Sequence, residues 1–389
     1  MTVAATALSP DLEAEQALLG ALLLAPSELE TVKVWLKPSH FLRPAHAALY
    51  EVLLAQRASG HPGSAKDSTR DQLRDWALDA LASAREASRG LTPSYASTLM
   101  LVCPTASHAN AYGRMVLESA IRRQVHTHAH RLQHAARAGS LDDVLRLSAE
   151  LHTAIHELAT TWGSLDECPR PLPGPWPLEL PDGIREKTLL DETALLSSST
   201  SVPDTLIATT RWLRPSDFLD PGHGAVYQAL AALARHAEPV DAMTVLWETQ
   251  RRGAIASGAI TADGVRAATR HGFSGDPQYW GERVLRASVL RGTADAAGVV
   301  RLLSRDTALP TARLLGSALH TLGTAEAVQD RWRTATGAPP RTQLPPAAVR
   351  ADRRGAARVR TPGPVSRTAV ALSPAEAAAS SRSPVRSTR

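Results

Sequence analysis

The feature of this sequence that most constrains its fold is an internal repeat of sixteen residues. Residues 35–50 and 212–227 match without a gap, and ten of the sixteen positions are identical. The offset of 177 residues is far longer than the roughly 20–50 residues of a solenoid unit, but it is an ordinary length for a domain. The 389-residue chain is therefore predicted to be a tandem duplication of one domain.

The same register continues upstream of the repeat, where Glu15 pairs with Glu192 and Leu18-Leu19 with Leu195-Leu196. The large and ring-bearing side chains shared by the two copies are predicted to form the structural core of each copy. These residues are Leu18, Leu19, Trp35, Phe41, Pro44, His46 and Tyr50 in the first copy, and Leu195, Leu196, Trp212, Phe218, Pro221, His223 and Tyr227 in the second.

Composition and periodicity indicate an all-α fold. Alanine is abundant and aromatic residues make up only 4% of the chain, which favours helices over sheets. Apolar residues recur at helical spacing after Pro44 and again after Pro221, and a proline is tolerated in the first turn of a helix.

Each copy is predicted to end in a long helical hairpin. In the first copy the hairpin covers residues 107–162, with Gly139 placed to end its first helix. The second helix carries an apolar stripe with the 3-4 spacing of a helix that seeks a coiled-coil partner. These interaction residues are Leu141, Val144, Leu151, Ile155 and Leu158. In the second copy the hairpin is expected at 280–333.

The chain is thus expected to contain two tandem helical domains, each a compact bundle followed by a hairpin. We place the first domain at 8–162 and the second, more diverged, at 188–335. Residues 163–187 contain six prolines and are expected to form an extended linker. Residues 336–389, rich in Ala, Pro, Arg and Ser, contain too few large apolar side chains to fold alone and are expected to be disordered.

The positive charge of the chain is concentrated in this tail. The whole sequence carries a net charge of +5, but residues 337–389 contain ten arginines against Asp352 and Glu376, a balance of +8. The remaining 336 residues are therefore mildly acidic, at −3. The tail could attract DNA through counterion release, or it could be a solubilising disordered end, and the sequence leaves both open.

The order of motifs resembles the N-terminal domain of the DnaB family of replicative helicases. The first copy supplies Glu-Gln-Ala-Leu-Leu-Gly at 15–20, then Phe41 and His46; the second supplies Phe218, His223 and Glu-Pro-Val-Asp at 238–241. The first copy departs from the family pattern at 60–68, and the second at 197–201, where a serine run replaces leucines.

The resemblance implies a domain that assembles a ring collar through its hairpins and offers surfaces to primase and loading factors. It therefore implies a replicative helicase or primase as partner, and self-association through the hairpins. Because the copies are tethered, one chain could mimic the hairpin-paired dimer that the family builds from two subunits. A Gly-Lys-Ser/Thr phosphate-binding loop, which a helicase of this family needs, does not occur, since the chain has no Gly-Lys dipeptide. We expect no enzymatic activity and no cofactor.

Histidines are the remaining candidates for a chemical site. His126, His130 and His134 lie at i, i+4 and i+8, where imidazoles on one helix face can share a metal ion. No cysteine or carboxylate completes the ligand set, so we favour a solvated face and predict no metal. His46 and His223 are interpreted as hydrogen-bonded structural residues, because no nucleophile stands beside them in the sequence.

The sequence favours a non-catalytic scaffold or regulator of DNA replication. The alternatives are a nucleic-acid-binding regulator that uses the basic tail, and a decayed helicase remnant. Cys103 and Cys168 form no disulfide or metal framework, and no apolar run is long enough to span a membrane. Without a secretory segment at the N-terminus, we expect a cytoplasmic protein.

Overall fold

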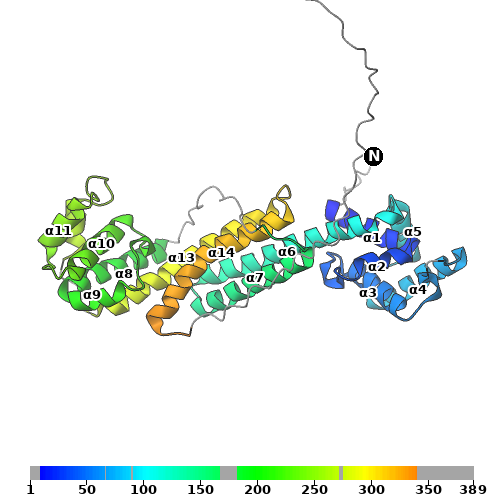
Figure 1. Cartoon of the computed structure of the whole chain (residues 1–389), viewed down its shortest axis with the longest axis horizontal. Coiled ribbons are helices and arrows are strands. Elements are labelled where there is room, and N and C mark those ends of the chain that lie inside the picture. Colours follow the sequence, from blue (N-terminus) through cyan, green and yellow to red (C-terminus); the bar gives the residue numbers. More distant parts are fainter. Residues whose placement is uncertain (1–8, 66, 89–90, 167–181, 271–274, 340–389) are drawn as a thin grey trace, which may run out of the picture. The chain divides into compact units, whose positions relative to one another are not determined.

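The computed structural model describes residues 9–65, 67–88, 91–166, 182–270 and 275–339 (Figure 1). Every regular element within these ranges is a helix, so the all-α prediction is confirmed. Most of the expected tail, from residue 340 on, and the proline-rich segment 167–181 with Cys168 lie outside the described residues. No helix in the described ranges is both long and apolar enough to cross a membrane.

The first copy consists of five helices and a hairpin, linked by short 3-10 turns. Its helices are α1 (Pro10–Leu24), α2 (Leu29–Val32), α3 (Pro44–Ala58), α4 (Arg70–Ala87), α5 (Pro93–Val102), α6 (Ala109–Ala138) and α7 (Leu141–Trp162). Its 3-10 turns are η1 (Pro26–Glu28), η2 (Pro38–His40), η3 (Pro62–Ser64) and η4 (Ala106–His108).

The second copy repeats this plan, again with five helices before the hairpin but with a single 3-10 turn among its described residues. Its helices are α8 (Asp182–Ser201), α9 (Pro203–Thr209), α10 (Pro221–Arg235), α11 (Ala242–Arg251), α12 (Ala262–Ala268), α13 (Pro277–Arg305) and α14 (Thr311–Thr336). Its 3-10 turn is η5 (Pro215–Asp217). The second hairpin therefore begins three residues before the expected start at 280 and ends three residues after the expected end at 333.

Local sequence signals set the ends of the hairpin helices. Gly139 follows α6 with φ 76°, Gly163 follows α7 with φ 86°, and Gly337 follows α14 with φ 66°. This left-handed conformation costs glycine little and is a common helix ending. Asp276 caps α13 by accepting a hydrogen bond from the backbone of Gln278 at 2.9 Å.

The last part of the predicted linker is helical, which corrects the boundary at 187. Residues 182–187 form the first turns of α8, so this helix starts earlier than expected. Pro181 is the last proline before it, and nothing after that residue blocks a helix. Asp182 in the first turn complements the positive end of the helix dipole.

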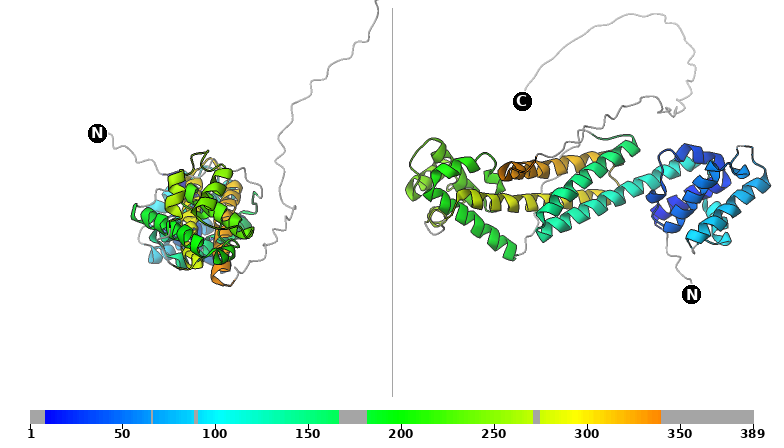
Figure 2. Two further views of the ribbon diagram at one scale, coloured as in Figure 1. Left: turned by 90° about the vertical axis from the view of Figure 1, so that its left-hand side faces the viewer. Right: turned by 90° about the horizontal axis from the view of Figure 1, so that it is seen from below.

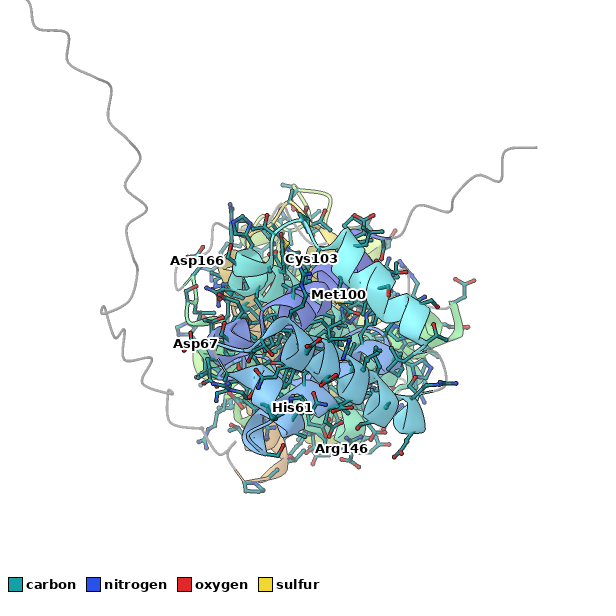
Figure 3. All side chains as sticks on the ribbon, turned by 90° about the vertical axis from the view of Figure 1, so that its right-hand side faces the viewer. His61, Asp67, Met100, Cys103, Arg146 and Asp166 are labelled. Atoms are coloured by element: carbon teal, nitrogen blue, oxygen red, sulfur yellow. The ribbon has the colours of Figure 1, made fainter. Side chains whose placement is uncertain are left out.

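The two segments that depart from the family pattern are well packed. In the first copy, Trp76 of α4 is fully buried and donates from Nε1 to the Leu22 carbonyl at 3.2 Å. Its ring lies edge-on to that of His61 at 5.6 Å between centroids, and His61 is labelled in Figure 3. In the second copy, Ser197, Ser198 and Ser199 are at most 1% exposed, and each hydroxyl donates to a backbone carbonyl. Buried hydroxyls of this kind carry no desolvation penalty from a missing partner, so these segments are rebuilt rather than eroded.

The helices of both hairpins pack against one another (Figures 1 and 2). Helices α6 and α13 run antiparallel, because Arg122 contacts the chain just after α13, whereas Arg286 near the start of α13 contacts the end of α6. One hydrophobic cluster joins the first copy to α13 and α14, and it includes Leu151 and Leu315. A second cluster fills the remainder of the second copy.

Candidate interaction site

A buried glutamate and a histidine anchor the opening helix of the first copy to its neighbour. The Glu15 carboxylate on α1 is 1% exposed and lies 2.6 Å from Nδ1 of His46 on α3. It also accepts from the backbone N–H groups of Leu42 and Arg43, the residues that lead into α3. The other His46 nitrogen, Nε2, lies 2.7 Å from the Tyr95 hydroxyl on α5. One carboxylate and one imidazole thus hold α1, α3 and α5 together.

The second copy repeats this arrangement. Glu192 on α8 is fully buried and lies 2.8 Å from Nδ1 of His223 on α10. It accepts from the backbone N–H groups of Leu219 at 2.5 Å and Asp220 at 3.3 Å. Among the described residues, no tyrosine hydroxyl contacts His223 as that of Tyr95 contacts His46, and the His223 side chain is 16% exposed.

His46 is enclosed by the protein on all sides. His46 has no exposed surface, so no substrate can reach its ring. A general base must come within hydrogen-bond reach of the proton it takes, and both nitrogens of His46 already have protein partners. In each copy the carboxylate partner of the histidine is the glutamate 31 positions upstream.

The 3-10 turn η2 in the first copy and its counterpart η5 in the second each bind the first helix of their own hairpin. Arg123 on α6 donates to the His40 carbonyl at 2.7 Å, and Arg291 on α13 donates to the Asp217 carbonyl at 2.8 Å. Because each arginine reaches the same position of the duplicated turn, the copies correspond here at an offset of 168 rather than 177 residues. The hairpins are therefore held rigidly at one end.

A glycine in each hairpin accommodates the repeated tryptophan. A Cβ atom at Gly113 or Gly281 would lie 2.8 Å from the Trp35 or Trp212 ring, respectively. This distance is shorter than two carbon atoms tolerate, so the close approach of ring and helix requires glycine. Within the turn itself, the rings of Phe41 and Tyr50 lie 5.0 Å apart between centroids, a packing distance typical of aromatic pairs.

The turn differs between copies at one titratable position. His40 is 5% exposed and accepts from the Lys37 backbone N–H at 3.1 Å. Burial, followed by the positive charges of Lys37 and Arg123, lowers the pKa of His40 to about 4. The second copy has Asp217 here, whose carboxylate accepts two hydrogen bonds from the guanidinium of Arg331 on α14.

The predicted interaction residues of the first hairpin are covered within the chain. Val144, Leu151 and Ile155 have no exposed surface, and Leu158 is 6% exposed. Leu141, at the start of α7, is half-buried against the same cluster. The cluster that contains them also contains Leu315, Ala318 and Leu322 of α14. The apolar stripe is therefore covered within the same polypeptide, by α6 of its own hairpin and by α14 of the second copy.

Polar contacts set the register between the two hairpins. Arg122 donates to the carbonyls of Asp306 and Leu309, which follow α13, and Arg286 donates to the Gly139 carbonyl, which follows α6, at 2.7 Å. Each arginine thus meets the carbonyl end of the opposite hairpin's first helix, where a cation is favoured. Gln133, close to the C-terminal end of α6, donates to the Ala294 carbonyl at 3.3 Å. Sequence reasoning missed these residues, because their spacing carries no periodic signal.

The remaining predicted core residues lie mostly where the repeat placed them. Leu18, Leu19, Phe41, Tyr50, Leu195, Leu196, Trp212, Phe218 and Tyr227 are all at most 7% exposed, and Trp35 is half-buried. Pro44 and Pro221 are exposed and open α3 and α10 instead of filling the core. They act as helix starters, as the sequence also indicated.

The histidine row on α6 does not gather a ligand set. His126 meets the Ser304 hydroxyl at 3.1 Å, and its ring stacks 6.5 Å from that of His130. No cluster of three or more histidine, cysteine, aspartate or glutamate side chains with metal-binding geometry occurs among the described residues, those around His134 included.

An exposed apolar pair lies on α11 of the second copy. Met243 and Trp247 are 71% and 67% exposed and stand four residues apart, on one face of the helix. Asp241 caps this helix by accepting from the backbone N–H groups of Met243 and Thr244. Tryptophan is among the residues most enriched at the energetic centres of protein interfaces, so the exposed face of α11 is a candidate docking face.

Comparison with known proteins assigns the sequence of this chain to a family. The family model described as DnaB-like helicase N-terminal domain matches residues 8–118 and 186–268. The replicative DNA helicase DnaB of Mycobacterium leprae is 31% identical over 115 residues, which cover 30% of this chain and 18% of that protein. The DnaB helicase of Leifsonia xyli is 29% identical over 146 residues, 37% of this chain and 30% of that protein. The matched region thus spans less than a third of either relative, and no solved structure matches the chain.

Proposed function

We propose a function for this chain, which belongs to the DnaB-like helicase N-terminal domain family through residues 8–118 and 186–268. In this proposal it is a non-catalytic interaction protein of DNA replication. Its partner in this proposal is a replicative helicase or a primase, and its place of action is the cytoplasm. The proposal treats the two copies as tandem domains that present binding surfaces instead of coupling ATP hydrolysis to movement.

The observation that carries the proposal is the packing of the two hairpins within one chain. Leu151 and Ile155 of the first hairpin are buried in one cluster with Leu315 and Leu322 of the second. The resemblance implies that the family uses these faces between subunits. A chain that satisfies them internally acts as a tethered pair of domains. It would have to expose its own core to exchange a hairpin with a helicase subunit, so we expect it to bind with other faces.

The exposed pair on α11 is the best candidate for such a face. Met243 and Trp247 project from a helix that is fixed at its start by the Asp241 cap. A rigid apolar face loses little conformational entropy on binding, which favours affinity. The helix follows the Glu-Pro-Val-Asp turn at 238–241, which only the second copy keeps.

Binding of the full chain to purified replicative helicase and purified primase from the same organism tests the proposal. We expect saturable binding to one of them, and Trp247→Ala should weaken it by about tenfold or more, as for an interface hot spot. Val34→Ala is the matched control, because Val34 is 83% exposed on the first copy and lies outside the proposed face. Absence of binding to both proteins at micromolar concentrations would contradict the proposal, and equal loss in both variants would remove α11 from it.

A further inference from the structure

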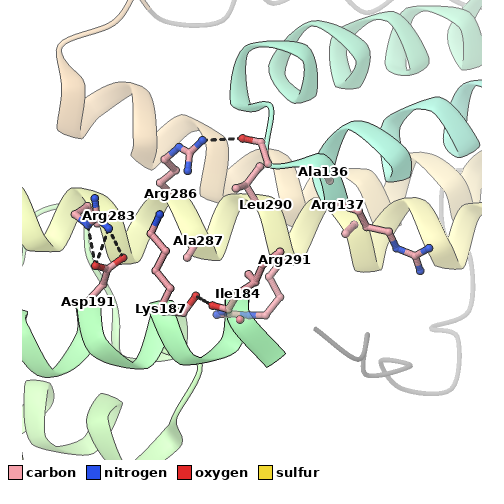
Figure 4. Close-up of a pocket in the computed structure, with 14 residues that line it drawn as sticks. Ala136, Arg137, Ile184, Lys187, Asp191, Arg283, Arg286, Ala287, Leu290 and Arg291 are labelled. Atoms are coloured by element: carbon pink, nitrogen blue, oxygen red, sulfur yellow. Dashed lines mark hydrogen bonds and ion pairs between the residues drawn. The ribbon is translucent and has the colours of Figure 1, made fainter. Parts of the chain in front are cut away.

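A cavity of about 560 Å³ lies between the end of α6, the start of α8 and the middle of α13 (Figure 4). This volume falls within the 300–1,000 Å³ that small-molecule sites occupy. It lies at one end of the contact between α6 and α13 and includes no residue of α11, and the proposed function does not account for it.

The cavity concentrates positive charge in an otherwise acidic body. Its lining includes five cationic side chains, Arg137, Lys187, Arg283, Arg286 and Arg291, and one carboxylate, Asp191. The cavity therefore carries a net charge of +4, whereas residues 1–336 together carry −3. Cations gathered in a concave site focus the field and attract anions.

Only part of this charge is neutralised within the protein. Arg283 forms a bidentate ion pair with Asp191, at 2.8 and 3.0 Å, and Arg286 donates to the Gly139 carbonyl at 2.7 Å. Arg291 donates to the Asp217 carbonyl, which carries no net charge. Figure 4 shows Lys187 rising from α8 with no dashed contact of its own. Arg291 also lies near the carboxylates of Glu192, Asp295 and Asp217. Arg137, Lys187 and Arg286 form no ion pair among the described residues, so an anion in the cavity would meet the charge of these three side chains.

The cavity is a property of the second copy and not of the duplicated fold. At the offset of the hairpins, Arg283 and Arg286 correspond to Met115 and Glu118 of the first copy. At the offset of the opening helices, Lys187 corresponds to Pro10, the first residue of α1. Helix α8 starts before that position, at Asp182, and its additional turn supplies Ile184 and so one wall of the cavity. The additional helical turn of α8 and the additional cationic side chains thus occur together in the second copy.

We propose that this cavity binds a small molecule that carries a di- or triphosphate group, such as a nucleoside triphosphate. The net charge of +4 matches a polyphosphate, and the planar guanidinium groups suit phosphate oxygens. Ile184, Ala287 and Leu290 provide an apolar wall for the nucleoside. The ligand is bound intact, because the proposal requires no bond to form or break.

Isothermal titration of the full chain with ATP, inorganic pyrophosphate and adenosine tests this assignment. We expect ATP and pyrophosphate to bind and adenosine not to bind. The double variant Arg137→Gln/Lys187→Gln should weaken ATP binding by about tenfold, which corresponds to a loss of about 1.4 kcal/mol.

Arg305→Gln is the matched control, because Arg305 holds the position in the second hairpin that Arg137 holds in the first, lies outside the cavity, and is also exposed. It should leave the affinity almost unchanged. The basic tail is the same in all variants, so any binding to it contributes equally. The assignment fails if neither phosphate compound binds at millimolar concentration, if adenosine binds as well as ATP, or if the double variant and the control behave alike.

Discussion

Asp166 and Gly316 approach so closely that no Cβ atom fits between them. A Cβ atom built at Gly316 on α14 would lie 1.9 Å from the Asp166 carbonyl oxygen. The backbone N–H of Asp166, just past the end of α7, donates to the Ala312 carbonyl at 3.1 Å. The chain leaving the first hairpin is therefore fastened directly to the second.

Gly316→Ala should destabilise the protein by about 1–3 kcal/mol, because an overpacked contact must displace the Asp166 backbone. Thermal unfolding followed by circular dichroism measures the effect. Gly323→Ala is the control, since Gly323 lies on the same helix with nothing within 4 Å of its Cβ position. There alanine should raise stability by up to about 1 kcal/mol through helix propensity. Stabilisation by both variants would show that the Asp166 contact does not persist in solution.

Removing the buried carboxylate in either copy should destabilise the whole molecule. Glu15→Ala and Glu192→Ala each leave a histidine and two backbone N–H groups without their acceptor. Leaving buried donors without an acceptor in this way costs about 1–3 kcal/mol for each group. Denaturant titration should show both losses in a single transition, because α13 and α14 share a hydrophobic cluster with the first copy.

Glu51→Ala on exposed α3 surface is the matched control and should change stability by less than about 0.5 kcal/mol. Two separate transitions, each sensitive to only one of the buried glutamates, would mean that the copies fold independently.

The stability of the protein should fall as the pH drops from about 6.5 towards 4. Burial, with the charges of Lys37 and Arg123, lowers the pKa of His40 in the folded state to about 4 from its ordinary value of 6.5. In this window the unfolded chain binds a proton at this position and the folded chain does not, so acidification favours unfolding. Above pH 6.5 the residue is neutral in both states and the effect vanishes.

His40→Asn isolates this contribution, because an asparagine oxygen can accept from the Lys37 N–H but does not titrate. Unfolding free energies measured from pH 7 to pH 4 should fall less steeply for the variant than for the natural chain. Parallel slopes would show that His40 is not the titrating group.

Sequence reasoning predicted the helical class and the duplicated elements because their signals are local. Each signal acts within a few residues: the prolines that open α3 and α10, Gly139 after α6, and the 3-4 stripe on α7. The start of α8 at Asp182 was missed because the proline-rich stretch predicts an extended linker, and no local signal marks that this linker ends at its last proline, Pro181. The burial of the serine run in α8 was not predicted, since a sequence does not show that the serine hydroxyls reach backbone carbonyls.

The partner of the hairpin stripe could not be predicted in the same way. The spacing of Leu151 and Ile155 shows that a helix must cover them, but a second chain and a second copy satisfy that requirement equally. The choice depends on contacts between residues more than 160 positions apart, such as Gln133 with Ala294 and His152 with Glu326. The cationic cavity has the same origin, because Arg137, Lys187 and Arg286 meet only after the hairpins pack.

Internal pairing of the hairpins, the central claim, can be tested directly by cross-linking. The two native cysteines are first replaced by serine. In that background, Arg122→Cys and Asp306→Cys place one thiol in each hairpin. These positions are close, because the Arg122 guanidinium lies 2.6 Å from the Asp306 carbonyl. A short bismaleimide should join them within one molecule. The mass, measured under denaturing conditions, should then stay at that of a single 41.5 kDa chain plus one linker. Cross-linked dimers at twice this mass, or thiols that remain unlinked, would contradict the account.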